Sequence, residues 1–179
     1  MKKLQSSDLI PLEQYTISTA LSADEIAQRL YLLTNLSGKK IRVPQSQKNI
    51  STYRGDVSKT GFKLSRYISY QNSFIPIIRG NMEPQTDKTD IRITMKLQLF
   101  VKVFMIIWLS LAGLASLVVL IIAANLLFRG RIHIMEPLAF IPVGMFIFGY
   151  LLMLLPFKLE AKKSKKELDL LFEAEPRSN

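Results

Sequence analysis

The sequence predicts a small cytoplasmic α+β domain, an antiparallel β-meander with one covering helix, fused to a two-helix transmembrane hairpin. The hairpin is indicated by two stretches of 26 and 21 residues that contain no charged side chain and lie 8 residues apart. A chain of 179 residues has too little remaining protein to bury both stretches in a soluble core. The α+β domain is indicated by short alternating patterns within the first 102 residues. The expected divisions are residues 1–102 for the domain, 103–128 and 137–157 for the membrane helices, 129–136 for the connecting loop and 158–179 for a charged tail.

The domain is expected to begin with a strand and a helix. Residues 15–21 alternate as a strand does. Ser22 and Glu25 then have the spacing of a capping box, in which the hydroxyl and the carboxylate each accept a hydrogen bond from the other residue's backbone N–H. Apolar residues follow at helical spacing, namely Ile26, Leu30 and Leu33. The pattern predicts one amphipathic helix over the face of a sheet.

Four further strands are predicted after a loop at residues 41–49. Their expected ranges are residues 50–57, 62–70, 74–82 and 91–101. The third contains Pro76 and Gly80, which is typical of an edge or a bulge. The last has the cleanest alternation, with one face formed by Ile91, Ile93, Met95, Leu97, Leu99 and Val101. These four strands are expected to form the meander.

Both apolar stretches are long enough to cross a bilayer. As a helix, residues 103–128 would be about 39 Å long, whereas a hydrocarbon core is ~30 Å thick. Residues 137–157 are close to the minimum length. Pro137 suits a first helical turn, and Pro142 predicts a mild kink one turn later. The short connection makes the two helices antiparallel.

The distribution of basic residues predicts the orientation of the hairpin. Nine lie beside its open end: Lys88, Arg92, Lys96, Lys102, Lys158, Lys162, Lys163, Lys165 and Lys166. The connecting loop has two, Arg129 and Arg131. Cytoplasmic flanks carry the excess of Lys and Arg, so both termini are expected in the cytoplasm or on the equivalent stromal side. The protein is thus expected to be an integral, multi-pass membrane protein with two spans.

Reactive groups are scarce in this chain. With no cysteine and one histidine, thiolate metal sites, iron–sulfur clusters and cysteine nucleophiles are excluded. His133 and Glu136 stand at i, i+3 in the loop, but two ligands without a third are a weak signal for a metal. The acidic residues Asp56, Glu83, Asp87 and Asp90 lie at turns, where carboxylates commonly accept backbone N–H bonds. Neither enzymatic activity nor a cofactor is therefore expected.

Small residues in the two apolar stretches are candidates for helix packing. They are Ala112, Gly113, Ser116, Gly144 and Gly149. Ala112 and Ser116 have a spacing that lets a second helix approach closely. The residues serve either packing of the hairpin on itself or contact with a helix of another subunit.

The tail has two features that point to contacts. Five lysines are candidates for contact with the membrane surface, each worth roughly 1 kcal/mol at an anionic leaflet: Lys158, Lys162, Lys163, Lys165 and Lys166. Leu168, Leu171 and Phe172 then form an apolar stripe. We expect this stripe to dock on a partner protein, the alternative being the chain's own sheet.

These features together predict a non-enzymatic accessory, assembly or scaffold subunit of a membrane protein complex, with membrane lipids and other integral membrane subunits as partners. The alternative is a binding domain for a lipid or another apolar ligand. Its pocket would be lined by aromatic side chains, namely Tyr53, Phe62, Tyr67, Tyr70 and Phe74. No nucleic acid partner is expected despite the net charge of +10, because lipid headgroups are the nearer anions.

Overall fold

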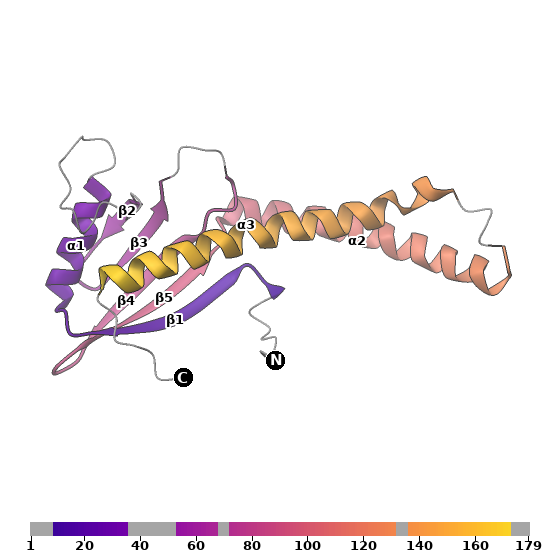
Figure 1. Cartoon of the computed structure of the whole chain (residues 1–179). Helices are drawn as coiled ribbons and strands as arrows, with labels where there is room; N and C mark the ends of the chain where they lie inside the picture. Colours follow the sequence, from indigo (N-terminus) through magenta and orange to yellow (C-terminus); the bar gives the residue numbers. More distant parts are fainter. Residues whose placement is uncertain (1–8, 36–52, 68–71, 132–135, 173–179) are drawn as a thin grey trace. The chain divides into compact units, whose positions relative to one another are not determined.

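The computed structural model describes residues 9–35, 53–67, 72–131 and 136–172, and it contains a sheet followed by two long helices (Figure 1). In chain order the elements are β1 (Leu12–Thr19), α1 (Ala23–Asn35), β2 (Tyr53–Val57), β3 (Gly61–Arg66), β4 (Ile77–Pro84), β5 (Thr89–Lys96), α2 (Leu99–Phe128), η4 (Pro137–Phe140) and α3 (Ile141–Leu171). The chain divides into two compact units. The sheet unit combines residues 1–98 with 156–179, and the hairpin unit comprises residues 99–155.

The sheet has five strands, all antiparallel, in the order β1-β5-β4-β3-β2. Strands β2 to β5 form the expected meander, and β1 adds to the free edge of β5. The alternation in β5 explains this central position, because Ile91, Ile93 and Met95 are fully buried. The prediction of an antiparallel α+β unit is thus confirmed.

Several strand boundaries differ from the sequence prediction. Strand β1 is Leu12–Thr19 instead of residues 15–21, and β4 is Ile77–Pro84 instead of residues 74–82. Strand β5 ends at Lys96 and α2 begins at Leu99, so Leu99 and Val101 are helical and do not continue the sheet face. Leu99 and Val101 fit two patterns at once, because they continue the alternation of β5 and also lead into the long apolar stretch. The helical conformation of that stretch prevails, and both residues are part of α2. Strand β3 ends at Arg66, and residues 68–70 of the predicted strand lie outside the described part of the chain.

Helix α1 starts at the predicted capping box. The Ser22 N–H donates to Glu25 Oε2 over 2.8 Å, and the Glu25 N–H donates to Ser22 Oγ over 3.3 Å. Two hydrogen bonds to the Glu25 carboxylate hold its pKa below the usual value. The bond from the Ser22 backbone N–H has the larger effect, and the bond from the Ser22 hydroxyl has the smaller one. The expected apolar face is buried, because Ile26, Leu30 and Leu33 pack against the sheet.

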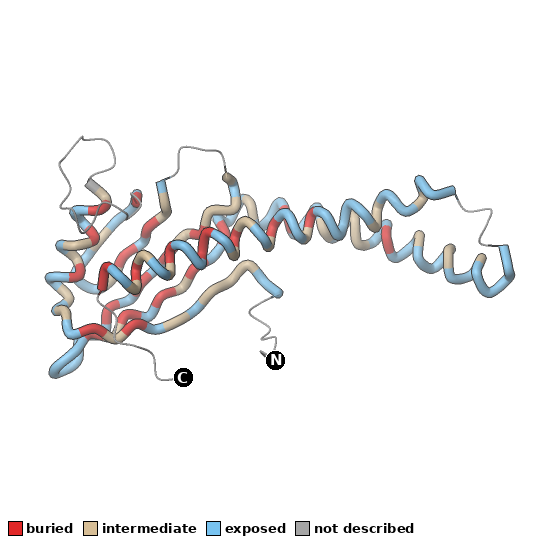
Figure 2. The backbone as a smooth tube through the Cα atoms, in the orientation of Figure 1, coloured by how far each residue is buried: buried red, intermediate tan, exposed pale blue. Residues whose placement is uncertain are grey.

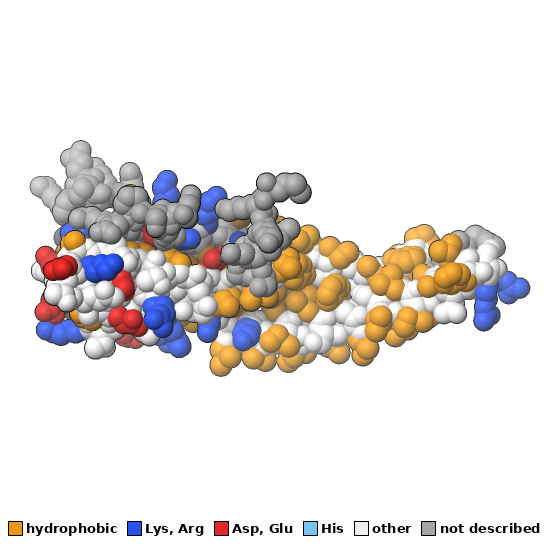
Figure 3. Space-filling view, turned by 90° about the horizontal axis from the view of Figure 1, so that it is seen from below, with side chains coloured by type: hydrophobic (Ala, Val, Ile, Leu, Met, Phe, Trp, Pro, Cys, Tyr) orange, Lys and Arg blue, Asp and Glu red, His pale blue; other side chains and the backbone are white. Residues whose placement is uncertain are grey.

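The hairpin unit contains two helices that are long and apolar enough to cross a membrane. Apolar side chains cover their visible surface in Figure 3. Helix α2 starts four residues before the predicted position. Pro142 lies in the first turn of α3, directly after η4, so the helix begins there and the expected interior kink is wrong. His133 lies outside the described residues.

The largest departure from the sequence prediction concerns the tail. Helix α3 does not end at Phe157 but continues to Leu171, with Pro156 in its interior. The charged segment after Phe157 is therefore the second half of a 31-residue helix. This half belongs to the sheet unit, and Figure 1 shows it lying along the sheet.

The core of the sheet unit lies on one side of the sheet, which we call the inner face (Figure 2). Its buried strand residues are Ile17, Thr19, Tyr53, Phe62, Leu64, Ile78, Met82, Thr89, Ile91, Ile93 and Met95. Helix α1 and the second half of α3 cover this face. The alternate residues of the strands form the outer face, which carries polar and charged side chains.

Candidate functional site

The second half of α3 attaches to the sheet through a continuous buried stripe. The buried positions recur every three or four residues, namely Phe157, Glu160, Ala161, Ser164, Leu168, Leu171 and Phe172. This spacing places them on one helical face. At the end of the stripe, the ring of Phe172 lies against that of Phe62, with centroids 6.1 Å apart. We call this attachment, together with its polar contacts, the helix lock.

A buried ionic cluster lies within the helix lock. Arg66, from the inner face of β3, donates from Nη1 to Glu160 over 2.7 Å. Its Nη2 lies 3.3 Å from Glu167. The side chains of Arg66, Glu160 and Glu167 are 15%, 5% and 15% exposed. A buried carboxylate without a cation is strongly unfavourable, so this arginine allows α3 to place both glutamates against the sheet.

Tyr53 completes the cluster from the neighbouring strand β2. Its hydroxyl donates to Glu167 Oε2 over 2.7 Å, and its ring is fully buried. Burial, followed by the negative charge of Glu167, raises the pKa of Tyr53 far above its usual value of 10.0. The phenol therefore stays protonated in the folded protein. It contributes stability below its ordinary pKa that is lost as the solution becomes strongly alkaline.

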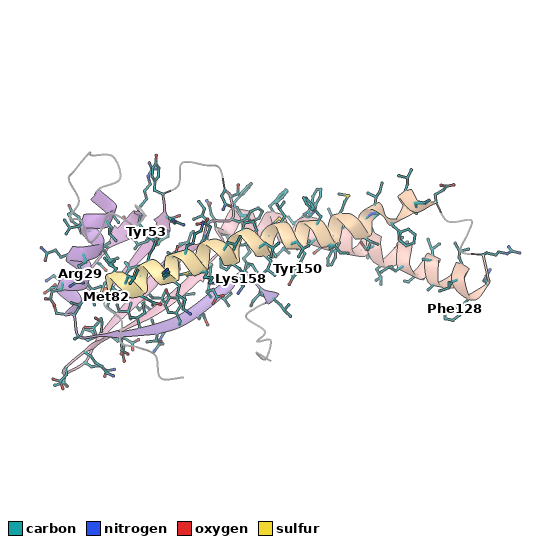
Figure 4. All side chains as sticks on the ribbon, in the orientation of Figure 1. Arg29, Tyr53, Met82, Phe128, Tyr150 and Lys158 are labelled. Carbon is teal, nitrogen blue, oxygen red and sulfur yellow. The ribbon has the colours of Figure 1, made fainter. Side chains whose placement is uncertain are left out.

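Polar contacts also fix both ends of the lock, and Figure 4 labels a side chain at each end, Lys158 at the start and Arg29 at the end. At the start, Lys158 Nζ lies 2.7 Å from Glu13 Oε1 and donates to the carbonyl of Leu12. At the end, Arg29 of α1 donates to the carbonyl of Leu171 over 2.9 Å. The Thr19 hydroxyl donates to the carbonyl of Phe172 over 2.5 Å. The last carbonyls of a helix have no intrahelical partner, and these two side chains supply one.

The helix lock revises the expected docking surface of the tail. Leu168, Leu171 and Phe172 are not an exposed stripe for a partner protein but are buried against the chain's own sheet. The physical reason is that this stripe continues the seam that begins at Phe157. The prediction that these three residues dock on a partner protein is therefore wrong, and they pack on the chain's own sheet, which was the alternative.

The five tail lysines fall into two groups. Lys158 is bound to Glu13, and the ammonium of Lys165 lies 4.8 Å from the ring centroid of Tyr15. Lys162, Lys163 and Lys166 are exposed on the opposite side of the helix, and Lys163 also reaches Glu160. Contact with a membrane surface remains a prediction for these exposed lysines. For Lys158 and Lys165, the structure gives partners inside the sheet unit.

The predicted helix-packing residues are mostly found between the two helices of the hairpin unit. The side chain of Phe146 borders Gly113, and Trp108 borders Gly149. Ser116 is buried and donates to the carbonyl of Ala112 over 2.6 Å. Gly144 differs from these residues, because an added Cβ would meet nothing within 4 Å.

The residues expected to line an apolar pocket do not come together. Tyr53 and Phe62 are core residues of the inner face, already in contact with α3. Tyr67 is exposed, with the guanidinium of Arg54 4.2 Å from its ring centroid. Phe74 is half-buried, and Tyr70 lies outside the described residues. The arrangement gives no support to a shared pocket.

Sequence reasoning missed the pairing of Arg66 with Glu160 and Glu167. A signal was present, because Phe157, Ala161, Ser164, Leu168 and Leu171 repeat at alternating intervals of four and three residues. The density of lysines in this segment hid that repeat. Among the described residues, no group of three or more His, Cys, Asp or Glu side chains is placed to hold a metal ion.

A scan against models of known protein families finds no match, and a search of curated proteins finds none either.

Proposed function

We propose that the chain is an integral membrane protein with two spans that acts as a non-enzymatic accessory, assembly or scaffold subunit of a membrane protein complex. The observation that carries this proposal is the continuity of α3. One part of this helix is apolar enough to span a bilayer, and the other is fixed to a sheet by buried ion pairs. A sheet fixed in this way is held at the membrane and can present its outer face to other components there.

Exposure of the hairpin helices supports the spanning role. In the apolar windows of α2 and α3, 17% and 11% of the residues are buried. A core helix of a soluble protein would bury most of its large apolar side chains, whereas side chains such as Leu111, Leu114 and Phe148 are exposed here. Exposed apolar surface on this scale is unfavourable in water and favourable in lipid.

The composition of the sheet unit supports a single topology. Residues from both sides of the hairpin form this unit, which favours a topology with both flanks on the same side of the membrane. The excess of basic residues at these flanks favours the cytoplasmic or stromal side. Both termini are thus proposed to be cytoplasmic or stromal, with the loop around Arg131 opposite.

Single cysteines test this topology, because the native chain has none. In intact cells, a cysteine at Ile134 should react with a membrane-impermeant thiol reagent, and one at Thr86 should react only after permeabilisation. Labelling of Thr86→Cys in intact cells would overturn the orientation. Release of the unmodified chain by alkaline extraction would overturn the membrane assignment itself.

The open surface at Gly144 provides a test of the subunit role. After purification in mild detergent, co-purifying membrane subunits should be identified for the wild-type chain and for Gly144→Leu. The larger side chain has space in the hairpin itself but would obstruct an approaching helix. Loss of the co-purifying subunits with an unchanged unfolding temperature is expected. A wild-type protein that purifies without any other subunit would contradict the proposal.

A further inference from the structure

The outer face of the sheet places like charges beside one another. The register pairs Lys63 of β3 directly with Arg79 of β4. It also pairs Glu83 of β4 directly with Asp90 of β5. Directly opposed like charges on one face destabilise a sheet, so neither pair is explained by the stability of the sheet.

The two kinds of charge occupy different ends of this face. Strand registers bring together basic residues at the end where β5 finishes, namely Arg54, Lys63, Arg79 and Lys96, with Asp56 the one acidic side chain among them. The opposite end carries Glu83 and Asp90, together with Arg92, whose guanidinium lies 3.4 Å from Glu83. We call the first group the basic end of the outer face.

The basic end has few internal counter-charges. All four of its cationic side chains are exposed. In the described part of the chain, no carboxylate lies within 4.0 Å of the ammonium or guanidinium nitrogens of Lys63, Arg79 or Lys96. Their charges are therefore available to an anion supplied from outside the sheet unit.

Exposed apolar and aromatic side chains border the basic end. Leu9 and Ile10 are 55% and 45% exposed, and only Pro11 separates them from β1, whose first residue pairs with Lys96. Tyr67 directly follows β3 and is 47% exposed, with Arg54 against its ring. Cations combined with tyrosine and aliphatic side chains are typical of segments at a bilayer interface.

The chain itself holds the basic end close to a membrane helix. Two residues, Leu97 and Gln98, separate the end of β5 from the first residue of α2. The three steps from Lys96 to Leu99 span at most about 11 Å, which is comparable to the screening length of ~8–10 Å near physiological ionic strength. In the described part of the chain, the turns that join β2 to β3 and β4 to β5 lie at the acidic end, and neither leads to a helix of the hairpin unit.

We propose that the basic end of the outer face binds the headgroups of anionic phospholipids, so that the sheet unit is held on the leaflet from which α2 departs. The site rests on the proposed membrane insertion of the hairpin. Lipid is favoured over an acidic protein for two reasons. The proposed membrane helix α2 begins only a few residues after the basic end, and the exposed side chains of Leu9, Ile10 and Tyr67 suit a bilayer interface. Binding at this site orders the sheet unit on the leaflet, and it weakens with salt and with loss of anionic lipid.

The test uses the full chain in lipid nanodiscs, with a single fluorophore on Ser65→Cys. Ser65 lies on the outer face of β3, paired with Arg54 on one side and Ile77 on the other. A second sample carries the fluorophore on Thr86→Cys, in the turn between β4 and β5. Lipids with a spin label in the headgroup quench a fluorophore that lies close to the leaflet. Quenching at Ser65→Cys should rise several-fold from zwitterionic discs to discs with one anionic lipid in four, and at Thr86→Cys it should stay low.

Salt and charge variants make the test specific. Raising the ionic strength from about 0.1 M to about 1 M shortens the screening length from ~10 Å to ~3 Å and should remove most of the gain. The triple variant Lys63→Gln/Arg79→Gln/Lys96→Gln should also remove it. A matched control, Lys59→Gln/Lys88→Gln/Arg92→Gln, removes the same charge from the opposite end and should keep the gain.

Several results would overturn this inference. The first is equal quenching in zwitterionic and anionic discs, and the second is an equal loss of the quenching gain in the control triple variant. The third is protection of Ser65→Cys from a thiol reagent in native membranes without any quenching in discs. The last result would identify a protein as the occupant. Alkaline extraction of the same chain from native membranes separates the two proposals. Release defeats the membrane assignment, whereas retention without quenching defeats the lipid site alone.

Discussion

The two halves of α3 share one helical conformation but differ in what they expose. Both bury a narrow stripe, which runs through Gly149 and Met153 in the first half and through Phe157 and Leu168 in the second. Away from the stripe, the first half exposes large apolar residues such as Ile147 and Phe148. The second half exposes mainly lysines, with Leu159 and Leu170 as its exposed leucines. Packing is therefore governed by the stripe, and the exposed residues distinguish the two halves: the first half is apolar enough to cross a membrane, and the second half carries charged side chains.

The largest expected effect concerns the polar part of the helix lock. Replacing Arg66 with Met should lower the free energy of unfolding of the sheet unit by about 3–5 kcal/mol, because Glu160 and Glu167 would be left buried without a cation. Denaturant unfolding of the full chain in detergent measures the change. Arg54→Met is the matched control, since it removes the same charge from the outer face. A similar loss in both variants would contradict the importance of the buried cluster.

The apolar part of the lock is tested by two leucines on opposite sides of the second half. Leu168 is buried, and Leu170 is exposed. Leu168→Ala should destabilise the sheet unit by about 2–5 kcal/mol, as expected for a cavity in a core. Leu170→Ala should change the free energy of unfolding by less than about 0.5 kcal/mol. Thermal unfolding of both variants compares them, and equal melting temperatures would mean that the buried stripe is misassigned.

A smaller effect is expected in the first half, where two glycines provide a matched pair. Gly149 borders Trp108, so Gly149→Leu should force the two helices apart at a cost of about 1–3 kcal/mol. Gly144→Leu fills open space and should leave the hairpin intact. A cross-link between cysteines at the buried positions Met105 and Met153 reports the separation. A lower cross-linking yield in the Gly144 variant than in the Gly149 variant would mean that Gly144, and not Gly149, lies at the contact between the two helices.

The smallest expected effect lies outside α3, at the start of α1. The pKa of Glu25 is lowered by the Ser22 N–H and hydroxyl, so the carboxylate stabilises the folded state above its ordinary value of 4.5. This contribution should disappear as the pH falls through the lowered value. Urea unfolding of the wild type and of Glu25→Gln should therefore differ at neutral pH and converge in acid. In a Ser22→Ala background, replacing Glu25 with Gln should still lower stability at neutral pH, but by less, because the backbone N–H of residue 22 still donates to the carboxylate.

The sequence predicted those elements whose signals are local. The capping box of Ser22 and Glu25 depends on residues three apart, and the alternation of β5 depends on residues two apart. The end of α3 could not be located in this way, because the stripe from Phe157 to Leu171 is interrupted by charges that serve distant partners. Arg66 and Glu160 are separated by 94 residues, and no local pattern reports such a pair.

The limits of sequence reasoning also explain the error at Leu168, Leu171 and Phe172. Their apolar character was correctly recognised, but apolarity does not identify the surface that will cover a side chain. Deciding between the chain's own sheet and a separate protein requires the position of Phe62, more than one hundred residues earlier.

The division of the sheet unit into two distant segments has a consequence for biosynthesis. Thr19 and Phe172 are joined by a hydrogen bond across 153 residues, and the whole hairpin is synthesised between them. During synthesis, the part of the inner face that α3 covers therefore stays exposed until both apolar helices have been made and the end of α3 follows. If the hairpin inserts into a membrane as proposed, a chain with one flank on the wrong side cannot bring Phe172 to Phe62. Such a chain would keep an exposed apolar face, the feature by which chaperones and proteases recognise failed products.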